Sequence, residues 1–384
     1  MRPGEEIGFR LKNRKKKHFS AQIFVFVLKK HIILSRKTFV MKKDFEILQF
    51  LHFHPESSRN EIETGLNLTE SPATLKRMLA LLVEQGNLVI TGQGRATRYS
   101  ISAQAQVTMP IDIDTYFKKE TDEREVQTSF NFSLINDVLP EVELFTADEK
   151  EYLKSLQTKF SNNIHGISET EYRKEMERLG IDLSWKSSQI EGNTYSLLET
   201  EKLLREKKTA SGKTKDEAIM LLNHKDALDF ILDNPDYLKE LSVRNIEDIH
   251  TLLVKELEVD KGIRSRRVGI TGTNYRPLDN EFQIREALED TCRLINAKEN
   301  VFEKAILALV LLSYIQAFSD GNKRTARITS NAILIANGYC PISFRTVDSV
   351  DYKKAMLVFY EQNNITAFKK IFIEQFAFAV EQYF

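Results

Sequence analysis

The stretch from Gln316 to Arg327 reads QAFSDGNKRTAR, and it ends the apolar run VFEKAILALVLLSYIQAF that begins at Val301. A run that is apolar nearly all round predicts a buried helix, and Gly321 then permits a tight turn. The next helix is predicted to begin near Asn322, so that its free backbone N–H groups and the positive end of its dipole face the turn. The sequence therefore predicts two helices joined by a loop that can hold an anion.

Three cationic residues lie in or near the first turn of that second helix. Lys323 and Arg324 are adjacent, and Arg327 follows three residues later on a neighbouring face, so both guanidinium groups can reach one polyphosphate. Asp320 beside such phosphates would suit Mg²⁺, which proteins hold through few carboxylates plus substrate oxygens. The alternative is an ordinary loop in which the charges are solvated and Asp320 merely caps the helix.

The composition is that of an ordinary globular protein. The chain has 384 residues, 42% of them hydrophobic and 29% charged, which is enough for two or three domains. Lys plus Arg and Asp plus Glu both number 55, so the overall charge gives no reason to expect a membrane or nucleic acid as partner. Cys292 and Cys340 are too few for a disulfide framework and lack metal-ligand spacing, so we expect a cytoplasmic protein.

The first forty residues carry a local excess of basic charge. They contain eleven Lys or Arg and two Glu, which leaves a net charge of about minus nine on the rest of the chain. We expect residues 1–40 to form a basic, disordered extension. Attachment to a membrane surface or to nucleic acid through RLKNRKKKH, and an export signal, are the alternatives. The apolar run FSAQIFVFVL is too short to cross a bilayer, so no membrane partner is expected.

Residues 41–105 are predicted to form a separate domain. A helical pattern over 43–53 is followed by Ser58 as a helix cap, and Ser71 with Pro72 opens the helix PATLKRMLALLVEQG. The segment NLVITGQGRATRYSI then alternates around a Gly-Gln-Gly tip, which predicts a hairpin. Three helices and a hairpin in this order resemble a winged helix-turn-helix domain.

In that family the third helix enters the major groove of duplex DNA. The resemblance implies that Thr74, Lys76 and Arg77 lie near DNA, with Arg95 and Arg98 on the wing. Such domains also serve as docking modules for proteins, which is the alternative.

The remainder of the chain is predicted to be mainly helical. We expect residues 106–165 to be a linker that leads into helices, and residues 166–384 to form one α-helical domain. Ser168 and Glu171 form a capping box, and only VGITGTNYRPL at 268–278 predicts a small β-hairpin. Amphipathic helices are predicted over 197–206, 213–232, 242–256, 281–297, 301–317, 323–337 and 349–381.

Three motifs of this helical part resemble those of Fic-domain (Fido) proteins, over about residues 160–380. SSQIEGN, residues 187–193, is similar to the family's inhibitory helix motif at Ser187, Glu191 and Gly192. Residues 262–278 are similar to the hairpin "flap" that precedes the signature. The signature HxFx(D/E)GN(G/K)RxxR is matched at Phe318, Asp320, Gly321, Asn322, Lys323, Arg324 and Arg327.

The resemblance implies transfer of AMP from ATP and Mg²⁺ to a Ser, Thr or Tyr hydroxyl of a target protein. Asp320 would bind Mg²⁺, and Arg327 would hold the γ-phosphate. Glu191 would pair with Arg327 and so exclude that phosphate, which is autoinhibition. The α- and β-phosphates would be surrounded by Gly321, Asn322, Lys323 and Arg324, and the target main chain would pair with the flap residues Ile270, Thr271, Gly272, Thr273 and Tyr275.

One position departs from the family pattern. The family's histidine, which takes the proton of the attacking hydroxyl, is Gln316 here, and an amide cannot act as a general base. His224 and His250 are expected to be helical histidines that do not replace it. The leading hypothesis is an autoinhibited and weakened adenylyltransferase. The alternative is a DNA-binding regulator whose Fic domain senses a nucleotide, and either protein could be a homo-oligomer.

Overall fold

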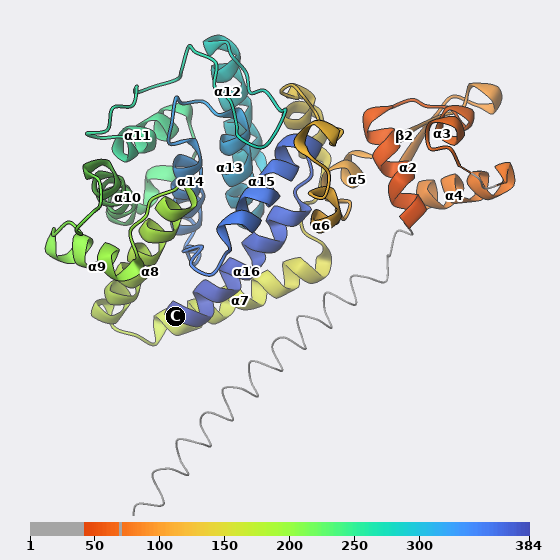
Figure 1. Cartoon of the computed structure of the whole chain (residues 1–384). Coiled ribbons are helices and arrows are strands. Elements are labelled where there is room, and N and C mark those ends of the chain that lie inside the picture. The colour runs from red at the N-terminus through yellow and green to blue at the C-terminus, as the bar shows by residue number, and fades with distance from the viewer. Residues whose placement is uncertain (1–41, 69–70) are drawn as a thin grey trace, which may run out of the picture. The chain divides into compact units, whose positions relative to one another are not determined.

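The structure, a computed structural model, describes residues 42–68 and 71–384 (Figure 1). The chain divides into two compact units, one ending at Ile101 and the other running from Ser102 to Phe384. The extension predicted for residues 1–40 lies outside the described residues.

The first unit contains three helices followed by a hairpin, in the predicted order. Ser58 and Ser71 cap the second and third helices by accepting hydrogen bonds from the amides of Glu61 and Thr74. The two strands are antiparallel, with Leu88 opposite Ile101. The elements are α2 (Lys42–Phe53), α3 (Arg59–Gly65), α4 (Pro72–Glu84), β1 (Leu88–Thr91), the 3₁₀ turn η2 (Gly94–Ala96) and β2 (Arg98–Ile101).

The second unit is built from helices, and the two-stranded sheet β1-β2 lies in the first unit, so the mainly α fold class is confirmed. Its longer helices are α7 (Ala147–His165), α8 (Glu169–Ile190), α9 (Leu197–Glu206), α10 (Lys215–Asp233), α11 (Val243–Leu253), α12 (Glu281–Ala297), α13 (Val301–Ile315), α14 (Asn322–Ala336), α15 (Ser349–Gln362) and α16 (Thr366–Tyr383). Its short elements are α5 (Ala103–Thr108), α6 (Ile113–Tyr116), η3 (Thr121–Glu123), η4 (Leu134–Val138), η5 (Leu139–Glu141) and η6 (Pro235–Leu238).

Helix α13 lies at the centre of the second unit. Every residue from Ala305 to Ile315 is buried, as its apolar sequence predicts. Helix α14 runs beside it and is itself buried from Arg324 to Leu334. The loop between these helices is therefore held by two buried helices.

The helix predicted over 349–381 is two helices. Asn363 ends α15 in the left-handed conformation, with φ of 49°, and α16 starts three residues later. Asn tolerates this conformation better than most residues, since its short polar side chain bonds locally. The apolar pattern continues through the break, so periodicity alone did not reveal it.

The prediction of a linker beginning at residue 106 is wrong. Val107, Leu134, Leu139 and Phe145 are buried in the core of the second unit. The amide of Ile365 donates to the carbonyl oxygen of Val107 at 2.9 Å. Apolar residues in this segment are spread over short elements without a helical period, so the sequence resembled a linker.

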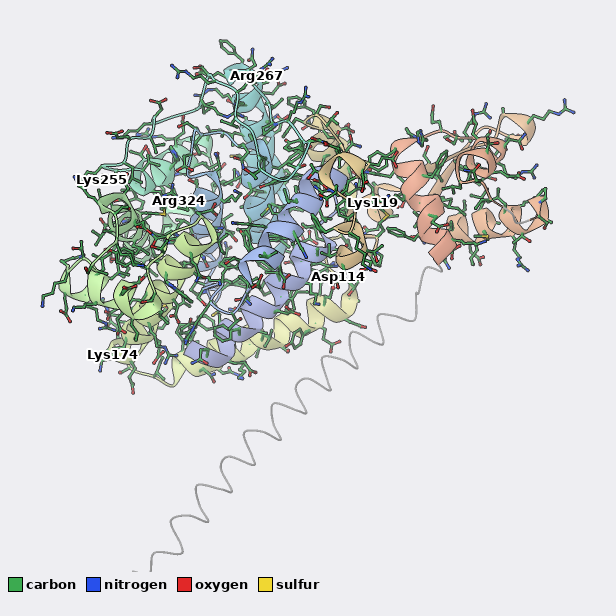
Figure 2. The ribbon with its side chains drawn as sticks, in the orientation of Figure 1. Asp114, Lys119, Lys174, Lys255, Arg267 and Arg324 are labelled. Atoms are coloured by element: carbon green, nitrogen blue, oxygen red, sulfur yellow. The ribbon has the colours of Figure 1, made fainter. Side chains whose placement is uncertain are left out.

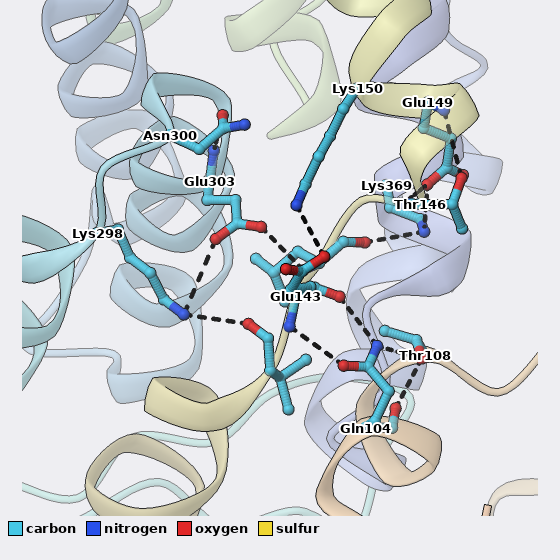
Figure 3. Close-up of polar contacts among 12 residues, drawn as sticks. Gln104, Thr108, Glu143, Thr146, Glu149, Lys150, Lys298, Asn300, Glu303 and Lys369 are labelled. Atoms are coloured by element: carbon cyan, nitrogen blue, oxygen red, sulfur yellow. Dashed lines mark hydrogen bonds and ion pairs between the residues drawn. The ribbon is translucent and has the colours of Figure 1, made fainter. Parts of the chain in front are cut away.

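Two lysines hold the end of this segment, as Figure 3 shows. Lys298 Nζ donates to the carbonyl oxygens of Leu139 at 2.8 Å and Val142 at 3.1 Å. Lys369 Nζ donates to Leu144 O at 2.9 Å and to a Glu149 carboxylate oxygen at 2.8 Å. These ammonium groups satisfy backbone carbonyls that lie outside regular structure.

The segment predicted as a hairpin, 268–278, is an extended loop with a turn at Thr271 and Gly272. Gly272 has φ of 86°, as a turn glycine can. The two arms of the loop do not pair with each other. Instead Arg276 forms a parallel bridge with Ser129.

No helix in the described part of the chain is long and apolar enough to cross a membrane.

Candidate functional site

The loop between α13 and α14 depends on two residues in the left-handed conformation. Gln316 ends α13 with φ of 53°, and Gly321 precedes α14 with φ of 81°. The Asn322 side chain closes the turn, because its Oδ1 accepts from Phe318 N at 2.8 Å and its Nδ2 donates to Phe318 O at 2.7 Å. Asn322 thus holds the loop from within the first turn of α14.

His250 on α11 supports the same loop. Its ring stacks on Phe318 with centroids 3.7 Å apart, and its Nε2 lies 3.0 Å from the carbonyl oxygen of Asp320. A Cβ on Gly321 would lie 3.4 Å from His250 and from Val254. Burial lowers the pKa of His250 to about 4, so the ring is neutral at pH 7 and can donate one hydrogen bond. The sequence predicted that His250 lies on a helix but gave no sign of its contacts with Phe318 and Asp320.

The three predicted cations gather at the N-terminal end of α14. Arg324, labelled in Figure 2, is buried and donates through Nη2 to Asp320 Oδ2 at 2.8 Å. Arg327 is fully buried and donates to Ser187 Oγ at 2.8 Å and to Ser187 O at 3.0 Å. Lys323 is less buried and points its charge at Glu191. The Nη1 atoms of both arginines are buried without a hydrogen-bond partner in the described chain.

The end of α8 faces this cluster. Glu191, the C-cap of α8, accepts from Arg327 Nη2 at 2.6 Å and lies 3.5 Å from Lys323 Nζ. Burial favours the neutral acid, but the charges of Arg327 and Lys323 outweigh it and lower the pKa of Glu191. Gly192 follows with φ of 102° and reverses the chain. The structure therefore brings Ser187, Glu191 and Arg327 together from elements far apart in sequence.

Gln316 carries an amide and no titratable group. Its side-chain Nε2 donates to Ser313 O at 2.6 Å, and its backbone carbonyl oxygen accepts from Arg264 Nε at 2.7 Å. His224 is fully buried, and its burial and then the Arg327 and Arg324 charges lower its pKa well below the ordinary value. Neither His224 nor His250 lies at a surface that a substrate could reach.

Asp320 is the carboxylate nearest the start of α14, and its side chain is 65% exposed. An exposed carboxylate beside Arg324 and Lys323 is of the kind that fits Mg²⁺, which keeps water and substrate oxygens as most of its ligands. No cluster of three or more His, Cys, Asp or Glu occurs in residues 42–68 and 71–384.

The predicted docking residues of the 268–278 loop do not share one environment. Thr271 and Gly272 are exposed, and Ile270 and Thr273 are partly buried. Tyr275 is a core residue: its ring stacks on Tyr314, and its hydroxyl donates to Tyr314 O at 3.0 Å. The Tyr275 side chain thus anchors the loop and is not available to a target.

The residues predicted to contact DNA lie in the first unit. Lys76 and Arg77 are exposed on α4, and Thr74 in the first turn of α4 is partly buried. Arg95 is exposed in η2 between the strands. Arg98 is partly buried, with Nη1 donating to Thr97 O at 3.2 Å.

A family model matches the part of the chain that contains this site. Residues 240–334 match the family model described as Fic/DOC family, a range that contains His250 and the whole loop between α13 and α14. The second unit is thus a helical domain in which buried arginines lie at the N-terminal end of one helix, α14. Within that class of domain, residues 240–334 of this chain are similar to the Fic/DOC family.

Curated relatives extend the likeness. The protein adenylyltransferase fic-1 of Caenorhabditis elegans is 25% identical over 223 residues, 56% of this chain and 43% of the relative. The protein adenylyltransferase Fic of Nematostella vectensis is 28% identical over 172 residues, 44% of this chain and 40% of the relative. The chain thus matches less than half the length of these relatives.

Solved structures show the same fold. A fragment of Fic-1 from C. elegans superposes with a TM-score of 0.54 at 23% identity, covering 62% of this chain and 72% of that one. A Fic family protein from Desulfovibrio desulfuricans has a TM-score of 0.50 at 19% identity, covering 62% and 75%.

Proposed function

We propose that the second unit binds ATP at the N-terminal end of α14 and transfers AMP to a hydroxyl group of a target protein. The observation that carries the proposal is the pair of buried arginines, Arg324 and Arg327, each with an unpartnered Nη1. An unsatisfied buried donor is costly, and a polyphosphate supplies several acceptor oxygens at once. The matched relatives bear the name protein adenylyltransferase, which fits this chemistry.

The residues have separate roles in the proposed reaction. Lys323, Arg324 and the amides at the start of α14 would hold the α- and β-phosphates, and Arg327 the γ-phosphate. Asp320 would hold Mg²⁺, which neutralises phosphate charge when it is bound. The target hydroxyl oxygen would bond to the α-phosphorus, the bond from that phosphorus to pyrophosphate would break, and the hydroxyl proton would leave to solvent.

Removal of the hydroxyl proton is the step for which this chain lacks a general base. Gln316 has no titratable group and its amide is already bonded to Ser313 O. A positioned general base contributes about 10² to 10⁴ in rate. We therefore expect ATP binding to persist while transfer is slow.

Glu191 opposes productive binding in this proposal. Its carboxylate accepts from Arg327 Nη2 at 2.6 Å, the group that would hold the γ-phosphate. Two anions cannot share this guanidinium without repulsion, so ATP binding requires Glu191 to leave.

The test is calorimetry of ATP with Mg²⁺ on wild type, Glu191→Gly and Glu191→Gln. We expect the glycine variant to bind more tightly by about tenfold or more, because it frees Arg327. Glu191→Gln keeps the size but not the charge, so its affinity should lie between the two. Arg324→Ala should abolish binding, since no neighbour replaces its charge. Equal affinity in all four proteins would contradict both the site and the block.

A second function, DNA binding by the first unit, is favoured by one observation. Lys76, Arg77 and Arg95 are exposed on α4 and on the turn between the strands. A winged helix would bring these elements to the major groove and the adjacent backbone. In that case the protein would be a regulator that senses a nucleotide through its second unit, and the slow transfer expected from Gln316 would not matter.

A further inference from the structure

Residues 113–129, here called the strap, run from α6 along the loop 268–278. The strap is attached to α15 through Glu361. Tyr116 donates its hydroxyl to Glu361 Oε2 at 2.5 Å, and the amide of Gln127 donates to Glu361 O at 2.8 Å. Glu361 therefore fixes the strap near both of its ends.

The strap holds the loop at three points. Arg124 Nη2 donates to Gly272 O at 2.5 Å, at the turn of the loop. Asn274 Nδ2 donates to Asp122 Oδ1 at 3.0 Å, and the amide of Arg276 donates to Thr128 O at 3.0 Å. The contacts are spread from the turn to the end of the loop, so they fix its position and its register.

Arg124 is buried and paired with a buried carboxylate. Its side chain is 5% exposed, and its Nη2 lies 3.1 Å from Oε1 of Glu361, whose side chain is fully buried. The guanidinium also lies over the ring of Phe117, 5.0 Å from the centroid. Burying the Arg124–Glu361 ion pair costs desolvation energy. In this position the guanidinium of Arg124 can also donate to Gly272 O.

The other half of the loop is free. The backbone amides of residues 268–271 make no hydrogen bond within the described chain, and Gly269 and Thr271 are exposed. An extended chain can add to such an unpaired edge through main-chain hydrogen bonds. Gly272 therefore separates the free half, residues 268–271, from the half that the strap holds, residues 272–278.

We propose that Arg124 is a positioning residue: through the strap it fixes the occupied half of the loop and so presents residues 268–271 to an extended segment of the target protein. The effect on the target rests on the proposed transfer function. The fixing of the loop does not, and it can be measured without any transfer.

The first arm measures hydrogen exchange by mass spectrometry in the full chain. Arg124→Met combined with Glu361→Gln removes the bond to Gly272 without leaving a buried charge. Lys369→Met combined with Glu149→Gln is the matched control, since Lys369 is also buried and also bonds a carboxylate and a carbonyl, that of Leu144. We expect exchange of the Arg276 amide, which donates to Thr128 O, to be at least tenfold faster in the first variant and unchanged in the control, with α13 protected in both.

Asn274→Ala gives an independent check, because Asn274 is exposed and its loss leaves the core intact. It should accelerate exchange of the same amide by a smaller factor. Unchanged exchange in both strap variants would overturn the proposal.

The second arm adds the Arg124 and Glu361 changes to Gln316→His with Glu191→Gly and supplies α-labelled ATP and cell lysate. We expect labelling about tenfold slower with unchanged ATP affinity, because no strap residue touches the phosphate-binding cluster. Equal labelling would overturn the presentation of residues 268–271 to a target. No labelling even with the strap intact would count against the transfer function, and the exchange arm would still decide the strap.

Discussion

In the proposed function, Gln316 would affect the transfer step and not the binding of ATP. Its backbone ends α13 in the left-handed conformation, where His is also tolerated better than most residues. The donors that we propose to bind phosphate are on other residues, so a change of this side chain leaves them in place. The position can therefore exchange a proton acceptor for an amide without loss of the fold.

Gln316→His, in a chain that also carries Glu191→Gly, should raise transfer of labelled AMP to protein by about 10² or more. The reason is that histidine supplies the missing base at an unchanged backbone. Rates of self-labelling with α-labelled ATP measure the effect. If Glu191→Gly alone labels protein just as fast, Gln316 does not limit the reaction.

His250 predicts a pH dependence of stability. Burial lowers its pKa from 6.5 to about 4, with the Arg324 charge acting in the same direction and Asp320 opposing it. The unfolded chain therefore binds a proton between these values that the folded chain does not. The contribution of neutral His250 is present in full above about pH 6.5 and is lost as the pH falls towards about 4.

Urea titrations of the full chain between pH 7 and pH 4.5 measure this loss. His250→Phe keeps a ring against Phe318 but cannot titrate, so its stability should fall less steeply, by up to about 1.4 kcal/mol per pH unit. His224 and the carboxylates remain in both proteins. Parallel curves for the two proteins would show that His250 is not protonated on unfolding in this range.

Among the elements, the segment 139–146 shows how irregular backbone is kept in a core. Lys298 reaches it from the end of α12, and Glu303 lies 3.8 Å from the same ammonium group. A cation surrounded by carbonyl oxygens replaces the hydrogen bonds that a helix or strand would supply.

Lys298→Met should reduce the free energy of unfolding by about 1 to 3 kcal/mol, because several buried carbonyls lose their donor. Lys304→Met is the control, since Lys304 Nζ makes one long hydrogen bond, to Asn296 O at 3.4 Å. Its expected loss is under about 1 kcal/mol. Similar losses in both variants, measured by urea unfolding, would mean that the carbonyls find other partners.

For the whole molecule, the two units carry separate proposed functions. The basic residues of α4 and of the turn between β1 and β2 belong to the first unit, and the buried arginines to the second. Binding of DNA and binding of ATP can therefore be removed one at a time.

The full chain should bind duplex DNA with an affinity that falls with salt. Lys76→Ala should flatten the slope of log affinity against log salt by about one unit if Lys76 contacts a phosphate. Arg324→Ala should leave this slope unchanged. Absence of DNA binding at low salt would make the first unit a docking module and remove the regulator.

The sequence by itself determined the parts that depend on local patterns. The caps at Ser58 and Ser71, the buried helix α13 and the turn at Gly321 follow from neighbours a few residues apart. The motif residues also indicated the resemblance to Fic-domain proteins, because their spacing is local.

Only the tertiary structure decided what depends on contacts between distant segments. Arg124 lies far from Gly272 and Glu361 in the chain, and no local pattern relates them. The sequence predicted only that His250 lies on a helix, and its stacking on Phe318 is set by the packing of α11. The reason is that burial and hydrogen bonding between distant segments are set by packing, whereas periodicity and capping are set along the chain.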